Sequence, residues 1–306
     1  MTAASHSLVV IAPRPLSAPP QAVEDALIDA GVQVLSRREL PVPRAFHRCR
    51  GAWVLGLGAV SVPDQVSATL VALGDELGMD CVLQSAAVRL NPYRLAVFDM
   101  DSTLIRCEVI DQMAIAAGVG EQVAAITERA MRGELDFQAS FRERLAMLRG
   151  LPEAALAEIA ANLPITEGLS ELMTTLRARG IRTAILSGGF AYFAEHLQQM
   201  FGFDSVHANG LDVVDGCLTG LPSGVIVDAQ YKRDMTAELA QEMGIELNQV
   251  IAVGDGANDL LMLGIAGLGV AFDAKPVVRE QADFSLSHVG LDGVLYLLGA
   301  DSERRA

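Results

Sequence analysis

Short apolar runs alternate with helical patterns over the first 87 residues of the chain. This pattern predicts the order strand, helix, strand, strand, helix, strand. The strands are expected at residues 8–11, 32–36, 52–57 and 81–84, and the helices at residues 21–30 and 62–77. The order is that of a split β-α-β-β-α-β module.

A turn-prone joint follows this module at residues 89–94. It contains Asn91-Pro92, and a proline disfavours helical geometry in the residue before it. A chain of 306 residues is also long for a single core. We therefore expect one domain over residues 1–88 and a second over residues 89–306.

The second domain alternates short apolar runs with longer helical patterns, as is typical of a parallel sheet covered by helices. Its strands are expected at residues 95–98, 183–186, 250–253 and 268–271, and a β-hairpin at residues 209–220. Residues 108–162 are helical in period and contain no clear strand. We expect an α/β domain with a Rossmann-like sheet and an inserted helical cap at about residues 107–165.

The composition restricts the partners of the protein. A net charge of −15 argues against nucleic acid and anionic membranes, which need a basic face. Uncharged runs are shorter than the roughly 18 residues that a membrane span requires, and no secretory pattern opens the chain. Four scattered cysteines fit reduced thiols. These features favour a cytoplasmic protein, and they leave a small anionic substrate open.

Two carboxylates, Asp99 and Asp101, follow directly on the first predicted strand of the second domain. Ligands of open parallel sheets bind at this carboxyl edge. An isolated pair of this kind is more often a pair of ordinary turn aspartates. Three further polar segments, however, occur near the ends of later strands: Ser187-Gly188-Gly189, Lys232, and residues 254–259 with the sequence Gly-Asp-Gly-Ala-Asn-Asp. Lys232 is conspicuous because the chain has only two lysines beside 21 arginines.

These four segments, in this order, resemble the motifs of the haloacid dehalogenase superfamily. Within it the chain is most similar to the phosphoserine phosphatase family, over residues 95–286. The resemblance rests on Asp-Met-Asp-Ser-Thr followed by Glu108, on Asp136-Phe137 with Ser140 and Arg144, and on the segments around Ser187 and Asp255. It implies that the helices of the cap form a lid over the substrate.

The resemblance also implies a covalent mechanism. Asp99 would attack phosphorus and become an aspartyl phosphate, while Asp101 would protonate the leaving oxygen and later deprotonate water. Mg²⁺ would lie between the Asp99 carboxylate, the Asp101 main-chain carbonyl and Asp255. The phosphate would be bound by Ser187, Gly188, Lys232 and Asn258, with Asp259 holding the lysine.

For the substrate, the resemblance assigns the ammonium group to Glu108 and the carboxylate to Arg144. Met131 and Phe137 match apolar contacts from the lid, although ordinary packing within the cap would explain them nearly as well. The second lysine, Lys275, is interpreted as a loop charge.

The sequence thus predicts a Mg²⁺-dependent phosphomonoester hydrolase that converts O-phospho-L-serine and water to L-serine and phosphate, the last step of serine biosynthesis. Two alternatives remain. One is a relative that acts on phosphothreonine, phosphohomoserine or another small phosphomonoester, and the other is an inactive regulatory binding protein. The amino-terminal module resembles ACT-like domains. We expect it to serve in homodimerisation or scaffolding, and amino-acid sensing is kept as a further hypothesis.

Overall fold

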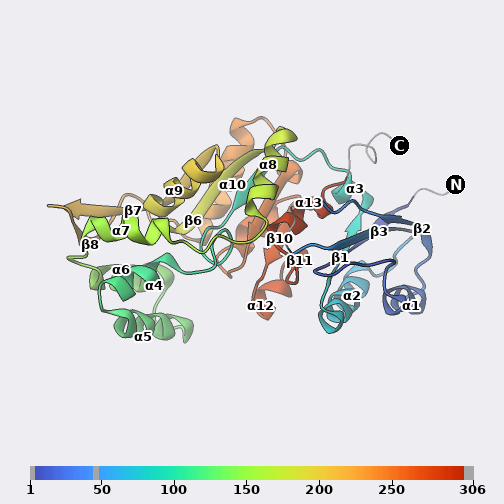
Figure 1. The fold of residues 1–306 in the computed structure, drawn as a ribbon, viewed down its shortest axis with the longest axis horizontal. Helices are drawn as coiled ribbons and strands as arrows, with labels where there is room; N and C mark the ends of the chain where they lie inside the picture. Colours follow the sequence, from blue (N-terminus) through green and yellow to red (C-terminus); the bar gives the residue numbers. More distant parts are fainter. Residues whose placement is uncertain (1–3, 44–47, 300–306) are drawn as a thin grey trace.

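The structure is a computed structural model that describes residues 4–43 and 48–299. Figure 1 shows an elongated molecule with a small sheet at one end, a larger sheet in the middle, and the cap beside a β-hairpin at the other end.

The small sheet is built from the amino-terminal elements β1 (His6–Ala12), α1 (Gln21–Asp29), β2 (Val34–Glu39), β3 (Gly51–Leu57), α2 (Pro63–Leu77) and β4 (Asp80–Ser85). Its strands are antiparallel in the order β2-β3-β1-β4. The predicted split order is confirmed. The second strand begins later than expected because the amide of Val32 donates to the carbonyl of Leu27 and so still closes the end of α1.

The larger sheet contains β5 (Leu95–Phe98), β6 (Arg182–Phe190), β7 (Ser205–Val214), β8 (Cys217–Ser223), β9 (Val250–Gly254), β10 (Leu268–Phe272) and β11 (Phe284–Leu286). The order is β11-β10-β9-β5-β6-β7-β8, and every pairing is parallel except that of β7 with β8. The four predicted strands and the hairpin are confirmed. Sequence analysis missed the three-residue β11, which is too short to show a period.

Helices form three groups. The predicted helical cap consists of α4 (Val109–Ala116), α5 (Gly120–Met131), α6 (Phe137–Met147) and α7 (Glu153–Ala161). The longer helices of the body are α8 (Leu169–Ala178), α9 (Ala191–Phe201), α10 (Ala229–Glu242) and α11 (Leu260–Ile265). One-turn helices are α3 (Ala86–Arg89), α12 (Pro276–Arg279) and α13 (Val294–Leu297), with 3₁₀ turns η1 (Leu247–Gln249) and η2 (Leu291–Gly293).

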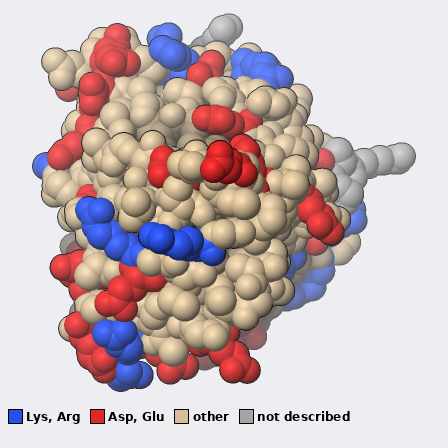
Figure 2. All heavy atoms as spheres, turned by 90° about the vertical axis from the view of Figure 1, so that its left-hand side faces the viewer, with Lys and Arg blue, Asp and Glu red and all other residues tan. Residues whose placement is uncertain are grey.

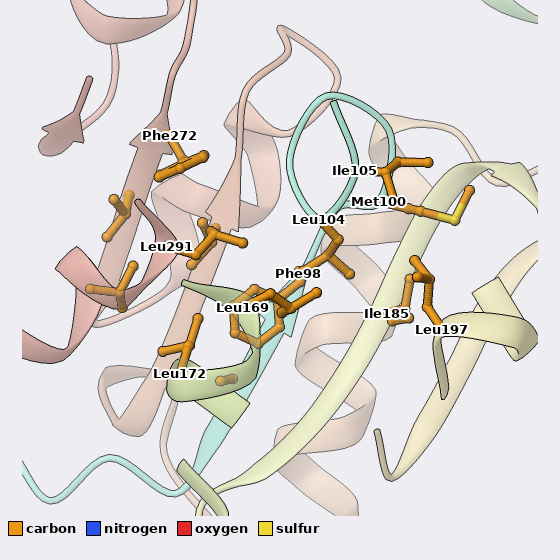
Figure 3. Packing of buried hydrophobic residues seen from close by; sticks show 14 of the residues in the cluster. Phe98, Met100, Leu104, Ile105, Leu169, Leu172, Ile185, Leu197, Phe272 and Leu291 are labelled. Carbon is orange, nitrogen blue, oxygen red and sulfur yellow. The ribbon is translucent and has the colours of Figure 1, made fainter. Parts of the chain in front are cut away.

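Helices cover both faces of the larger sheet. Alternate residues of β5 point to opposite faces, so Phe98 packs with Leu172 of α8 and Leu197 of α9, whereas Val97 packs with α10 and α11. Figure 3 shows Phe98 among Leu169, Leu172, Ile185 and other buried side chains. Burial on both faces explains why β5 is a continuous apolar run.

The amino-terminal module has a core of its own on one face of its sheet and shares the core of the body on the other. One face of its sheet packs on α1 and α2, but the other contributes Val9, Ile11 and Val54 to the same apolar cluster as Leu295 of the body. Buried Arg89 donates to the carbonyl oxygen of Tyr296 at 3.0 Å. The module is therefore fixed to the body by apolar packing and by hydrogen bonds.

Charged side chains of both signs lie side by side on the end of the molecule formed by the cap and the β7–β8 hairpin (Figure 2). Among the described residues, none of the helices combines the length and apolar character needed to cross a membrane.

Candidate active site

A tight turn at the carboxyl end of β5 presents the two aspartates. Buried β5 lies between β6 and β9, so its end is central in the sheet. Ser102 has a φ of 58°, and the amide of Thr103 donates to the carbonyl of Met100. The turn places Asp101 against the start of α4, where its Oδ1 accepts a hydrogen bond from the amide of Val109 at 3.3 Å.

Lys232 lies between two carboxylates in the interior. It comes from the first turn of α10, a helix capped by the Asp228 side chain, and it has no exposed surface. Its Nζ is 2.7 Å from Oδ1 of Asp99 and 2.7 Å from Oδ1 of Asp259. Burial lowers the pKa of this ammonium, but the charges of Asp259 and Asp99 outweigh burial and raise it. Lys232 therefore stays charged beside Asp99.

The end of β6 forms a concave backbone segment next to the aspartates. Ser187 Oγ accepts from the amide of Gly189 at 2.9 Å, and Asn209 Nδ2 donates to the carbonyl of Gly188 at 2.7 Å. Asn209 also accepts from the amide of Val227 at 2.7 Å. Sequence analysis missed Asn209, because a single asparagine in a strand gives no sign that it braces the neighbouring strand.

Glycines allow this close approach. A methyl group added to Gly189 would lie 2.5 Å from Oδ2 of Asp101 and 2.7 Å from Cε of Met100. At Gly254, the last residue of β9, it would lie 2.5 Å from the carboxyl carbon of Asp259. The two glycines therefore let neighbouring backbone approach the acidic side chains.

Three carboxylates gather where β5 and β9 end. Asp99, Asp255 and Asp259 each offer an oxygen within 4.8 Å of the others. Thr103 Oγ1 donates to Asp255 Oδ1 at 3.2 Å, and the amide of Gly256 donates to Asp259 Oδ2 at 3.0 Å. Oxygen ligands grouped in this way suit a hard divalent cation.

The pKa values of these acids reflect burial and crowding. Burial, and then the charges of Asp259 and Glu108, raise the pKa of Asp255 to about 7. Burial also raises the pKa of Asp99 well above its usual range, and the negative charge of Asp259 raises it further. Burial and then the charge of Glu108 raise the pKa of Asp101 in the same way. A cation bound among these groups would offset the crowding of negative charge.

These groups open into a cavity of about 340 Å³. Of the predicted site residues, those that line it are Asp99, Asp101, Glu108, Phe137, Arg144, Gly188, Asp255 and Asn258. Ser187, Lys232 and Asp259 are fully buried beneath this lining. The segments that sequence analysis picked out from distant parts of the chain thus meet in one place.

The cap supplies the other side of the cavity. Glu108 precedes α4 and accepts from Ser102 Oγ at 2.9 Å, while Arg144 and Phe137 come from α6. Within the described part of the chain, neither Glu108 nor Arg144 makes an ion pair. Burial lowers the pKa of Arg144, and Glu108, Asp111 and Asp101 offset part of this effect. An anion and a cation therefore line the cavity, and neither is held in an ion pair with another described residue.

Met131 and Lys275 lie differently with respect to the cavity. Met131 lies at the end of α5, is 73% exposed and does not line the cavity. Sequence analysis interpreted Lys275 as a loop charge, but it lines the cavity, directly before α12. The only sequence signal for Lys275 was the scarcity of lysine in the chain.

The comparisons with known proteins agree with this site. The family model of the haloacid dehalogenase-like hydrolases matches residues 93–267. A phosphoserine phosphatase from Haemophilus influenzae is 50% identical over 213 residues, which are 70% of this chain and 68% of that protein. The unliganded structure of a probable phosphoserine phosphatase from Vibrio cholerae superposes with a TM-score of 0.78 at 36% identity, over 97% of this chain and 87% of the other.

A third relative was solved as a phospho-aspartyl intermediate analogue of phosphoserine phosphatase. It is 39% identical, has a TM-score of 0.63, and covers 67% of this chain and 99% of its own. The family model spans the part of the chain that contains Asp99, Ser187, Lys232 and Asp255. This chain belongs to the phosphoserine phosphatase family of the haloacid dehalogenase-like hydrolases.

Proposed function

We propose that this protein hydrolyses O-phospho-L-serine to L-serine and phosphate, the reaction that completes serine biosynthesis. The observation that carries the proposal is a single cavity lined by two chemically different sets of residues. Asp99, with Lys232 behind it, suits a phosphoryl group, and Glu108 and Arg144 suit the charged groups of an amino acid.

Asp99 is the proposed nucleophile. Its carboxylate attacks phosphorus, a P–O bond forms, and the bond from phosphorus to the serine oxygen breaks. Asp101 supplies the proton for that oxygen, and burial, with the charge of Glu108 adding to it, raises the pKa of Asp101 and so favours the protonated form that this step needs. In the second step Asp101 takes a proton from water, which attacks the aspartyl phosphate and regenerates Asp99. The relative solved with a phospho-aspartyl analogue supports this route.

Charge stabilisation comes from fixed groups of the chain. Lys232 cannot turn away from Asp99, because it is fully buried and Asp259 holds the same Nζ. Ser187, the amide of Gly188 and Asn258 are the proposed ligands of the phosphate oxygens. Such preorganised donors need no rearrangement as charge develops, which makes them effective in a site with little water.

The acidic cluster is the proposed Mg²⁺ site. Mg²⁺ held by Asp99, Asp255 and the main-chain carbonyl of Asp101 would bring the nucleophile and the phosphate together and offset their repulsion. The oxygen-only donor set and the raised pKa of Asp255 fit such an ion. Asp259 belongs to the same cluster, but Lys232 and Gly256 already occupy its oxygens, and its proposed role is to support the lysine.

Glu108 and Arg144 are the proposed ligands of the substrate ammonium and carboxylate groups. The only hydrogen bond of the Arg144 side chain among the described residues is to the carbonyl of Ser140 in its own helix, at 3.4 Å. Its guanidinium therefore remains available for a carboxylate, which it can bind through two hydrogen bonds. Phe137 packs beside these groups and stacks on Phe141, with ring centroids 6.2 Å apart.

The decisive experiment compares phosphate release from phosphoserine, phosphothreonine and phenyl phosphate, with and without Mg²⁺. We expect Mg²⁺-dependent preference for phosphoserine. Arg144→Gln should raise KM for phosphoserine about tenfold or more, the effect of losing a charged hydrogen bond, and leave KM for phenyl phosphate within about twofold, because phenyl phosphate has no carboxylate.

The matched control is Arg142→Gln, which removes an equal charge from an exposed position of the same helix. This variant should leave KM for phosphoserine and KM for phenyl phosphate unchanged. Preference for another ester would support phosphatase activity but show that phosphoserine is not the substrate. Absence of any hydrolysis would favour a regulatory binding protein.

A further inference from the structure

The four-residue helix α12 separates two cavities. Lys275, Val277 and Val278 line the catalytic cavity, while Pro276 and Arg279 line a second cavity of about 640 Å³. The second cavity lies between the body and the amino-terminal module, and residues of α2 and β4 form its other wall. Figure 1 shows α12 between the cap and α2.

So short a helix has little stability of its own. The described hydrogen bonds within it are those from the amides of Val278 and Arg279 to Lys275 and from Glu280 to Pro276. Isolated helices shorter than about 12 residues are marginal in water, so packing and side-chain contacts must hold α12 in place. The position of this wall of the catalytic cavity therefore depends on what α12 contacts on its other side.

The amino-terminal module provides that contact through Asp75, near the end of α2. Arg279 Nη2 lies 2.9 Å from both carboxylate oxygens of Asp75. Nε2 of His288 lies 3.0 Å from Oδ1 of the same carboxylate. Arg279 is only 20% exposed, so the pair is partly shielded from water.

A second carboxylate of the module holds the other end of the same segment. Asp80 is buried at the start of β4, and its two oxygens accept from the amides of Ser287 and His288 at 2.7 and 3.0 Å. Residues 276–288 are thus attached to the module at both ends.

We infer that Asp75 and Arg279 are positioning residues, through which the amino-terminal module holds the α12 wall of the substrate cavity. The inference rests on the proposed phosphatase function. It gives the module a part in substrate binding that requires neither an amino-acid ligand nor a second subunit. Neither Asp75 nor Arg279 lines the catalytic cavity, so their effect is exerted through α12.

The kinetic test uses Asp75→Asn, Arg279→Gln and the double variant. Each single change should raise KM for phosphoserine about two- to fivefold, the effect of a partly exposed ion pair, and leave kcat within twofold. The double variant should be no worse than either single one, because two residues of one pair are not additive. Arg279→Lys, which keeps the charge, should recover part of the loss.

The control is Glu24→Gln, which breaks an ion pair of 2.6 Å with Arg37 inside the same module. It should leave KM unchanged. Effects on KM that multiply in the double variant, or an unchanged KM in folded single variants, would overturn the inference.

Hydrogen exchange measured by mass spectrometry separates this inference from the proposed function. Amides of residues 277–282 should exchange faster in Asp75→Asn than in the unchanged protein, and at the normal rate in Glu24→Gln. If the unchanged protein does not cleave phosphoserine, the proposed function fails and the exchange result still decides the role of Asp75. If the unchanged protein cleaves phosphoserine and exchange in Asp75→Asn is unaltered, the positioning role of Asp75 is rejected and the proposed function stands.

Discussion

Asp99, Lys232 and Asp259 form a buried row in which one ammonium group contacts two carboxylates. An unpaired charge in such a place would be costly, so each member of the row depends on the others. Lys232 retains Asp259 as a partner when Asp99 is changed, and this makes the proposed nucleophile testable without loss of the fold.

Asp99→Asn should fold normally and lose essentially all turnover, by at least about 10³-fold in kcat, because the amide cannot act as the nucleophile. Phosphate release and a thermal melt measure the two effects. Substantial activity in a folded variant would contradict the assignment of Asp99.

Proton competition should make Mg²⁺ binding depend on pH. A proton occupies the Asp255 carboxylate below its pKa of about 7, and a metal needs the deprotonated group. The affinity for Mg²⁺ should therefore weaken as pH falls, about tenfold from pH 8 to pH 6 for this group alone. Calorimetric titration measures it. Asp255→Asn should bind weakly at both pH values, and a constant affinity in the unchanged protein would count against Asp255 as a ligand.

At the level of residues, sequence analysis picked out segments with several polar residues close together, as around Asp99 and Asp255, and the structure brings these segments to one cavity. It was less informative for single residues whose role depends on distant backbone. Lys275 lines the cavity from the position directly before α12, and the side chain of Asn209 donates to the carbonyl of Gly188 in the neighbouring strand. No local sequence pattern indicates either position.

The end of β6 shows how closely two elements approach in this site. Gly189→Ala should lower kcat/KM by about 10²-fold, because the added methyl group would displace Asp101, and small misplacements of catalytic groups have effects of that size. Gly188→Ala is the matched control. Its methyl group would lie 3.4 Å from Phe137 Cζ, an ordinary contact, and we expect a change below about fivefold.

Equal loss of kcat/KM in both variants would show that the concave β6 segment tolerates no side chain at all. In that case the contact between Gly189 and Asp101 would not be the particular constraint that the geometry suggests.

The elements that sequence analysis found were continuous apolar runs or helices with a clear period, and those that it missed were short and had neither signal. The β5, β6, β9 and β10 strands are buried runs, and the cap helices have a clear period. By contrast, α12 and β11 contain four and three residues, and neighbouring elements rather than their own sequences maintain them. This explains why the contact of the module with α12 could not be foreseen.

At the scale of the whole molecule, one apolar cluster joins the amino-terminal sheet to the body. Trp53, the single tryptophan, lies in β3 of the module, whereas the candidate active site lies in the body. Heating should therefore abolish the native Trp53 fluorescence and the enzymatic activity at the same temperature, within about 2 °C, as in one cooperative unit. Fluorescence melting and residual activity provide the comparison. An early fluorescence transition with activity retained would show that the module unfolds separately.

The scarcity of lysine determines where amine-reactive reagents can attach to the surface of the protein. The only two lysines are Lys232, which has no exposed surface, and Lys275, which is exposed at the catalytic cavity. Apart from the α-amino group, an amine-acylating reagent would find one accessible side chain on the native protein. A fluorophore or surface linker attached to Lys275 by that reaction would stand at the cavity used by the substrate, so immobilisation through this lysine would block the enzyme.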